Sequence, residues 1–332
     1  MASRLAAYHA QRALAAALNR AQERHVLFYS RGGSIPRGGG RIDALLRAAP
    51  AESVSGVLRF TEQGEGISQN FGLRANAMRT LERAFNTLTL ATLAVRRGAT
   101  VQESDAYAQA AVQIAAASRA AWRGLLDGPG FFEFFRAVTP IDVIERMRIG
   151  AIQRREPQDA QNAAGVQATA WVYAWSQSRH MLPGWFGAGT GLEVVRTQHG
   201  LELLRGAYGS WPFFRSLIDD IEAMLARADM EISACYDQLA PPELAGIAAA
   251  IRAEFTLTST QILQVKGSGE LLDSDRTLQR SIAVRNPYVD PMNLMQVDLL
   301  QRWRAGGRSD PALLEALLAS VTGIGLGLQT AG

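Results

Sequence analysis

The chain has 332 residues, of which 48% are hydrophobic, so it is long enough to form one large domain or two smaller ones. A formal net charge of only +3, without a basic tract, gives no reason to expect a nucleic-acid partner. The lone Cys235 excludes an intrachain disulfide, and we find no apolar stretch long enough to span a membrane, so we expect a cytoplasmic protein without a membrane partner.

Helical periodicity dominates the chain. Apolar residues recur at helical spacing over residues 5–24, 75–97, 104–126, 190–208, 212–228 and 242–263. Short apolar or β-branched runs, which we predict to be strands, lie at 25–29, 57–61 and 171–175. Beyond residue 188 we see no further strand. This order is typical of an α-rich α/β fold that contains part of a (β/α)8, TIM-like barrel with large helical insertions and a C-terminal helical layer.

The visible strands are too few to close an eight-stranded barrel. A partial barrel would expose strand edges and an apolar face. Either some strands escape the pattern, or the chain is part of something larger. We divide it into residues 1–190, with the barrel strands, and residues 191–332, a helical region with a possible effector site.

The most informative segment is the glycine-rich loop at residues 31–40, directly after the apolar run at 26–29. Its glycines allow backbone N–H groups to converge on an anion. The guanidinium groups of Arg31 and Arg37 add bidentate recognition of phosphate or carboxylate. A flexible linker is the alternative, but linkers rarely follow a strand so closely. We therefore predict an anion-binding loop.

Three other polar segments are candidates for a site. Residues 58–65 place carboxylates and an amide after a strand, which indicates either a site wall or a charged strand end. In residues 174–190, Arg179 is either the partner of a buried anion or stacked on Trp185 in a packed aromatic turn. Residues 284–291 are predicted to form a proline-bounded turn capped by Asp290, which leaves Arg285 without a structural explanation.

The four histidines, at positions 9, 25, 180 and 199, show no metal-ligand spacing. We also find no Ser-His-Asp elbow. Structural or surface roles are therefore expected for all four histidines.

Together these segments resemble the phosphoenolpyruvate carboxylase family. Residues 28–40 resemble the family's F-H-G-R-G-G-x-x-G-R-G-G loop, and residues 58–65 resemble L-R-V-T-E-Q-G-E. Further similar segments are F-R-A-V-T-P at 135–140, residues 174–190, W-P-F-F-R at 211–215, R-N-P-Y-V-D-P at 285–291 and V-T-G-I-G at 321–325. Order and spacing are preserved from residue 5 to the end, and the resemblance covers roughly the last third of the family sequence.

The resemblance implies a carboxy-lyase that joins phosphoenolpyruvate and bicarbonate to give oxaloacetate and phosphate. It also implies assistance by Mg²⁺ or Mn²⁺, a homo-oligomer, and feedback inhibition by aspartate or malate. The catalytic residues carried over by position are Arg31, Arg37 and Arg179. The substrate-binding residues are Gly32, Gly33, Gly38, Gly39, Gln63 and Glu65, and the effector-binding residues are Arg227, Arg285 and Thr330. Arg37 would be shared between the two sites.

The match also departs from the family pattern. The family's metal-binding carboxylates, catalytic histidine and active-site lysine lie upstream of the matched region, so the metal ligands are expected outside this chain. Tyr29, Ser30 and Pro36 are unusual residues for the loop, and Gln167 and Ile152 stand where the family has arginines. At the effector site, Arg227 replaces a lysine and Thr330 an asparagine.

Three functional hypotheses follow. The chain is a fragment or split subunit that needs an N-terminal carboxylase segment, a divergent enzyme acting on a related phosphorylated or carboxylate substrate, or a non-catalytic regulatory paralogue.

Overall fold

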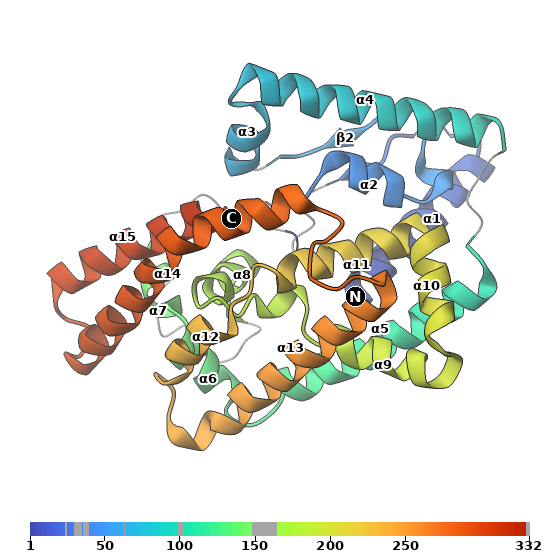
Figure 1. Cartoon of the computed structure of the whole chain (residues 1–332). Helices are drawn as coiled ribbons and strands as arrows, with labels where there is room; N and C mark the ends of the chain where they lie inside the picture. The colour runs from blue at the N-terminus through green and yellow to red at the C-terminus, as the bar shows by residue number, and fades with distance from the viewer. Residues whose placement is uncertain are drawn as a thin grey trace. The chain divides into compact units, whose positions relative to one another are not determined.

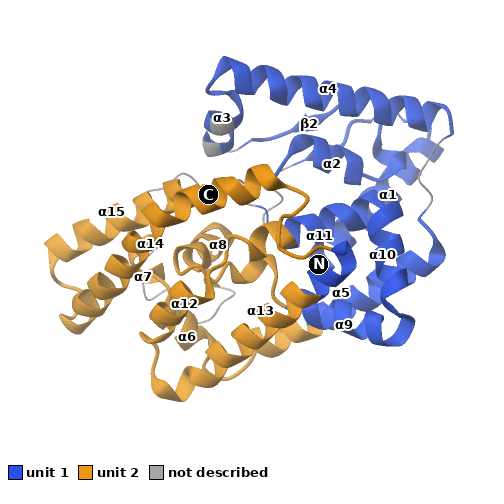
Figure 2. Ribbon diagram, viewed as in Figure 1, with its two compact units in different colours: residues 1–119, 187–221, 261–267 blue, residues 120–186, 222–260, 268–332 orange. Residues whose placement is uncertain are grey.

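The computed structural model describes residues 1–23, 25–29, 35, 40–62, 64–98, 103–147 and 165–329, apart from the side chains of Glu65 and Gln69 (Figure 1). The chain forms two compact units that interleave along the sequence (Figure 2). Unit 1 consists of residues 1–119, 187–221 and 261–267, and unit 2 of residues 120–186, 222–260 and 268–332. These boundaries differ from the predicted division at residue 190. That division separated a barrel region from a region with a possible effector site, and it stays a prediction.

The first third of the chain carries both strands. Its elements are α1 (Ala2–Arg20), β1 (Phe28–Tyr29), α2 (Ile42–Ala48), the 3-10 helix η2 (Ala51–Ser53), β2 (Arg59–Phe60), α3 (Gly64–Phe71), α4 (Arg74–Arg96) and α5 (Asp105–Leu126). The described elements that follow are α6 (Phe131–Val138), α7 (Ile141–Ile144), α8 (Ala168–Gln177), η4 (Leu182–Gly184), α9 (Ala188–His199), α10 (Leu201–Ser210), α11 (Pro212–Leu225), α12 (Met230–Asp237), η5 (Pro242–Leu244), α13 (Ala245–Lys266), α14 (Arg276–Ala305) and α15 (Pro311–Leu328). The prediction of an α-rich chain is therefore confirmed.

The two strands form one parallel pair in unit 1. Phe28 pairs with Arg59 and Tyr29 with Phe60. This confirms strands within 25–29 and 57–61, although each described strand has only two residues. Phe28 and Val57 are each 55% exposed. Large apolar side chains so exposed on and beside a strand are the kind of surface that a further packing layer would cover.

The third predicted strand, at 171–175, is wrong, because this segment lies inside α8. Trp171 and Trp175 are one helical turn apart, with ring centroids separated by 5.8 Å. Phe135 of α6 packs against both rings, at centroid distances of 4.4 and 5.3 Å. The aromatic run therefore reflects an i, i+4 contact on a helix, which a short apolar segment does not distinguish from a strand.

The predicted turn at 284–291 is also wrong, because α14 continues through it. Pro287 and Pro291 both lie in the helix interior, where each lacks the N–H that would normally bond to the preceding turn. Helix α14 runs beside α15 in unit 2 (Figure 1). The side chain of Asp275, rather than that of Asp290, caps the start of the helix by accepting a hydrogen bond from the Leu278 N–H at 3.0 Å.

The helix predicted at 190–208 is divided into α9 and α10. Gly200 separates them with φ 84° and ψ 163°, a backbone conformation that L-residues with a side chain rarely adopt. A glycine within an apolar periodic segment therefore ended one helix and began the next.

By length and composition, α15 is long and apolar enough to cross a membrane, contrary to the sequence-based expectation. One third of its apolar window is buried within the structure. The buried side chains include Leu317, Val321 and Ile324, and the helix contacts α14, α7 and α8. These contacts pack one side of α15 within unit 2.

A buried ion-pair cluster joins α7 to the end of α14. Asp142 has a side chain only 5% exposed and accepts hydrogen bonds from Arg304 at 2.9 Å and from Arg308 at 3.1 Å. Burial raises the pKa of the Asp142 carboxyl, but the charges and hydrogen bonds of the two arginines outweigh it, so the pKa lies below its usual range.

We expect Asp142→Asn to lower the free energy of unfolding of unit 2 by about 3–5 kcal/mol, because it leaves a largely buried guanidinium without its charged partner. Since the pKa of Asp142 is depressed by folding, the stability it contributes is present above the unfolded-state pKa and is lost as pH falls through the folded-state pKa. Urea denaturation at several pH values should therefore show a smaller acid-side loss of stability in the variant. The control Asp298→Asn removes an ion pair whose side chains are both 59% exposed, and should change stability by less than about 1 kcal/mol. Equal losses in both variants would contradict the assignment.

Candidate functional site

The carboxyl ends of β1 and β2 lie at the same edge of the strand pair, because the strands are parallel. The Thr61 N–H donates to the Tyr29 carbonyl at 3.0 Å and extends the pairing just beyond β2. In the sequence, β1 is followed by the glycine-rich segment 31–40, and β2 is followed by Thr61, Glu62 and, from Gly64, helix α3. We call this edge of unit 1 the strand-end edge.

Glu62 is an acidic residue at the strand-end edge, and the structure describes its side chain. It lies against the first turn of α3, where a Cβ added to Gly66 would come within 2.6 Å of its Oε2. The glycine thus permits the carboxylate to approach the amino-terminal turn of the helix, where the helix dipole favours a negative charge. The sequence pattern left open whether residues 58–65 form a site wall or a charged strand end. In the structure, the carboxylate of Glu62 lies against the first turn of α3.

Tyr29, which replaces the family's histidine, is tied to its own unit. Its hydroxyl accepts a hydrogen bond from Gln11 of α1 at 2.5 Å, and Gln11 also donates to Ser53 at 2.9 Å. Burial raises the pKa of Tyr29 above its usual value. Its hydroxyl is therefore neutral at physiological pH and acts as an anchor for β1.

Most of the predicted catalytic and substrate-binding residues lie outside the described residues. These are Arg31, Gly32, Gly33, Arg37, Gly38, Gly39 and Gln63, together with Pro36. Glu65 is described only by its backbone, in the first turn of α3. Thr330 and Ile152 also lie outside the described residues. Their roles stay predictions.

Arg179 lies in unit 2 with a fully buried side chain. Its Nη1 donates to Asp290 Oδ1 at 2.6 Å, and its Nη2 donates to Asn286 Oδ1 at 3.3 Å. Weaker contacts join Nη1 to Asn293 Oδ1 at 3.5 Å. The three partners stand at i, i+4 and i+7 on α14, a spacing that places side chains on one face only if the segment is helical. The guanidinium therefore explains why α14 remains a helix through its two prolines.

The segment that carries Arg179 is a strained turn. Arg179 has φ 60° and Met181 has φ 51°, and such left-handed conformations cost free energy for residues other than glycine. The turn is held at both sides by backbone hydrogen bonds: Met181 N–H donates to the Trp175 carbonyl at 3.0 Å, and Asp229 N–H donates to the Arg179 carbonyl at 3.0 Å. A second ion pair joins Arg179 Nη2 to Asp229 Oδ2 at 3.7 Å.

His180, between the two strained residues, forms a hydrogen-bonded array that the sequence pattern did not reveal. Its Nδ1 lies 2.9 Å from the Ser178 hydroxyl, and its Nε2 lies 3.1 Å from Asp237 Oδ1. Ser178 and His180 are buried, and in this array the serine contacts the nitrogen that a catalytic triad reserves for the carboxylate. The array therefore fixes the turn, and a structural role for His180 fits the prediction.

Arg179 is continuous with a buried polar network between α8, α12, α14 and α15. Asn293 donates to the Gln177 carbonyl at 2.7 Å and to the Tyr236 hydroxyl at 3.0 Å. Gln296 receives a hydrogen bond from Tyr236 at 2.8 Å and donates to Ser320 at 3.0 Å. Burial raises the pKa of Tyr236 well above its usual range, so it stays a neutral hydrogen-bonding group. Buried polar groups satisfied in this way specify one packing of the helices.

Of the predicted effector residues, Arg227 and Arg285 are described and both lie near Arg179 within unit 2. The Arg227 carbonyl accepts from Arg179 Nε at 3.4 Å. Arg285 directly precedes Asn286, a partner of Arg179, and its Nη1 donates to the Gly327 carbonyl at the end of α15 at 3.1 Å. Burial lowers the pKa of the Arg285 guanidinium. The backbone of Arg227 therefore contacts Arg179, whereas the side chain of Arg285 binds the carbonyls of Ser281 and Gly327.

The described residues contain no group of three or more histidine, cysteine or acidic side chains that could hold a metal ion. A magnesium site therefore does not fit the part of the chain that the structure describes, and we derive no chemical step through a metal.

Comparison with known proteins decides the family. The sequence profile of the phosphoenolpyruvate carboxylase family matches residues 1–332. The chain belongs to the phosphoenolpyruvate carboxylase family. A phosphoenolpyruvate carboxylase from Xanthomonas campestris is 43% identical over 310 residues, which cover 93% of this chain and 34% of that protein. One from Roseiflexus castenholzii is 37% identical over 347 residues, covering all of this chain and 36% of that protein. The family prediction is thus confirmed.

The chain spans about a third of the length of these phosphoenolpyruvate carboxylases. A relative from Thermus thermophilus gives the same picture, with 37% identity over 99% of this chain and 37% of that protein. The activity, substrates and partners of a whole phosphoenolpyruvate carboxylase are therefore proposals for this chain.

We expect Asp290→Asn to lower the free energy of unfolding by about 3–5 kcal/mol, because it leaves the fully buried Arg179 without its closest charged partner. In an Arg179→Met background the same change should cost less than about 1 kcal/mol, since no buried charge remains. A double-mutant cycle measured by urea denaturation gives the coupling.

Asp127→Asn is the matched control for this cycle, because Asp127 is 64% exposed in its pair with Arg123 and should couple weakly. A coupling for Arg179 and Asp290 no larger than that of the exposed pair would show that the buried cluster does not hold unit 2 together.

Proposed function

We propose that this chain supplies the carboxyl-terminal part of a phosphoenolpyruvate carboxylase, and that a preceding segment completes a barrel and provides the metal ligands. The observation that carries the proposal is the strand-end edge, where parallel β1 and β2 end side by side, each directly before a segment of the sequence predicted to belong to the site. This is the edge at which α/β barrels place their chemistry. The exposed Phe28 beside it favours further strands as neighbours.

The proposed reaction begins with attack of a bicarbonate oxygen on the phosphorus of phosphoenolpyruvate. The bond from phosphorus to the enol oxygen breaks, giving carboxyphosphate and the enolate of pyruvate. Carboxyphosphate then releases phosphate and CO₂, and the enolate carbon attacks CO₂ to form oxaloacetate. Negative charge gathers on phosphoryl oxygens and then on the enolate, so guanidinium groups are suitable stabilising partners.

Arg31 and Arg37 are proposed to hold the phosphoryl oxygens, with the glycines of the loop allowing it to close over the substrate and exclude water. Gln63 and Glu65 would line the wall. Mg²⁺ or Mn²⁺, held by ligands outside this chain, would neutralise phosphate charge when bound.

The guanidinium of Arg179 is buried and paired with Asp290. To reach a phosphate, Arg179 would have to give up that pair, at a cost that substrate binding would need to offset. We propose that its first task is to fix the strained turn, and that substrate contact follows opening of the Asp290 pair.

We further propose that aspartate or malate binds near Arg227, Arg285 and Thr330. The guanidinium of Arg285 donates hydrogen bonds to the carbonyl groups of Ser281 and Gly327. Both acceptors are uncharged, so neither bond neutralises the positive charge of Arg285. A dicarboxylate is an anion that such a group would attract. A homo-oligomeric assembly and a cytoplasmic location complete the proposal.

A non-catalytic regulatory paralogue is the second candidate. It is favoured by the complete burial of Arg179, which in this arrangement serves packing. A divergent enzyme on a related phosphorylated or carboxylate substrate is favoured only by sequence departures, namely Pro36 and Gln167.

The test is magnesium- and bicarbonate-dependent formation of oxaloacetate from phosphoenolpyruvate, with the chain assayed alone and co-expressed with the segment encoded upstream of it. We expect activity only in the pair. Arg31→Ala should lower kcat by about 10²–10³-fold, as loss of a group that stabilises transition-state charge does. The control Arg83→Ala changes an exposed arginine of α4 and should leave kcat unchanged. An active pair that is indifferent to Arg31→Ala contradicts the assigned role, and inactivity in every combination favours the regulatory paralogue.

A further inference from the structure

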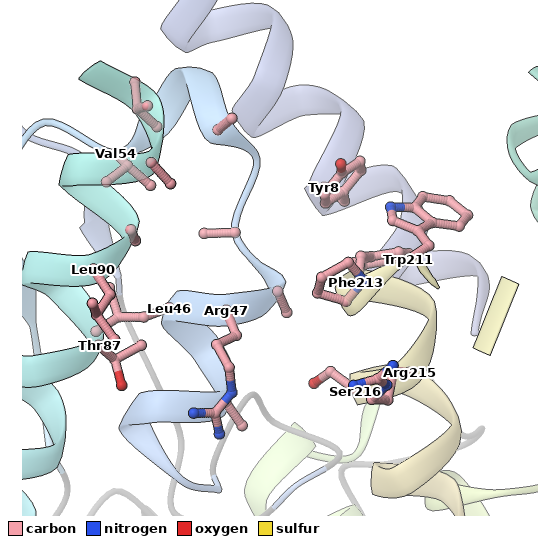
Figure 3. A pocket seen from close by; sticks show the side chains of 18 of the residues that line it. Tyr8, Leu46, Arg47, Val54, Thr87, Leu90, Trp211, Phe213, Arg215 and Ser216 are labelled. Carbon is pink, nitrogen blue, oxygen red and sulfur yellow. The ribbon is translucent and has the colours of Figure 1, made fainter. Parts of the chain in front are cut away.

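A cavity of about 640 Å³ lies within unit 1, apart from the strand-end edge (Figure 3). Residues of α2, η2 and α4 line one side, and residues of α1 and α11 line the other. Its volume falls in the range of pockets that enclose small organic molecules. We call it the α2–α4 pocket.

The interior of the α2–α4 pocket is apolar and shaped by small side chains. Six alanines line it, at positions 44, 48, 49, 51, 91 and 94. Tyr8, Trp211 and Phe213 also line it, and they pack together with ring centroids 4.3 to 5.9 Å apart. Figure 3 shows these aromatic residues on one side of the pocket and Val54, Leu46 and Leu90 on the other. Aromatic rings and small alanine side chains in one lining leave room for a flat or chain-like apolar body.

One end of the α2–α4 pocket is polar and positively charged. Arg47 and Arg215 both line it, and Figure 3 places them with Thr87 and Ser216 at the end away from Val54 and Tyr8. Arg215 donates to the carbonyls of Tyr208, at 3.0 Å, and Gly209, and both of these acceptors are uncharged.

Two carboxylates near this end, those of Asp43 and Asp219, also bind cations other than Arg47 and Arg215. Asp43 accepts from Arg47 at 2.5 Å and also from Arg41 at 2.7 Å. Asp219, which lines the pocket, pairs with Lys266 Nζ at 2.6 Å. Cations therefore outnumber carboxylates around this end, and an anionic group of a ligand would be favoured there.

We propose that the α2–α4 pocket binds an amphipathic organic anion, with an aliphatic or aromatic body in the alanine-lined interior and a carboxylate directed to Arg47 and Arg215. The site rests on unit 1 alone and is independent of the proposed carboxylase function.

The pocket is lined by α2, the helix that follows the glycine-rich segment in the sequence. A second cavity of about 310 Å³ shares Tyr8, Ala48 and Phe213 with it and extends to Phe28 and Tyr29 of β1. Helix α2, which lines both cavities, begins two residues after Gly40, at the end of the loop. A bound anion would therefore contact the helix that anchors the loop on its carboxyl-terminal side.

Isothermal titration of the 332-residue chain with submicellar decanoate, and in parallel with decanol, tests the site. We expect saturable binding of one decanoate per chain. Arg47→Gln should weaken decanoate binding by about 10-fold and leave decanol unchanged, because one charge-assisted hydrogen bond is lost. Ala94→Phe, which fills the interior, should abolish binding of both.

Two matched variants serve as controls. Arg83→Gln and Ala75→Phe change exposed residues of the same helix, α4, and should bind like the parent chain. If Ala94→Phe does not melt cooperatively, it is not folded and is left out. The test then consists of decanoate and decanol binding by Arg47→Gln compared with Arg83→Gln. Absence of saturable decanoate binding, or equal binding by Arg47→Gln and the parent, would overturn the proposal.

Discussion

The ion pair between Arg179 and Asp290 is the contact around which unit 2 is organised. A buried guanidinium is tolerated only when charged and polar partners replace the water it has lost, and Asp290, Asn286 and Asn293 do so from one face of α14. Because those partners must stay in helical register, α14 remains a helix across Pro287 and Pro291. Its continuation then provides the surface on which α15 packs.

The same contact links structure to the proposed chemistry. Arg179 has a left-handed backbone conformation, whose free-energy cost several interactions together must offset. These interactions come from His180, Asp229 and the backbone of α8. A turn over-determined in this way holds the guanidinium in one position against Asp290. Release of the guanidinium would be costly, so the proposed substrate contact would compete with stability for one side chain.

Sequence reasoning performed best where a local pattern had one physical explanation. Long amphipathic periodicity predicted α1, α4, α5 and α13 closely, because burial of one helix face imposes that spacing. It failed where two structures share a pattern: residues 171–175 are apolar in a strand or a buried helix, and the aromatic contacts with α6 decided for the helix. The prolines of 284–291 predicted a turn because the partner that stabilises the helix, Arg179, lies more than a hundred residues away.

For the site, motif spacing alone pointed to the family, and the family comparison confirmed it. The sequence by itself therefore determined the family and the helical character, since these depend on local residue order. Only the tertiary structure decided that Arg179 is buried against α14, that His180 joins Ser178 to Asp237, and that alanines and aromatic rings line one α2–α4 pocket. Those features arise from side chains far apart in the sequence, whose meeting is set by how the helices pack.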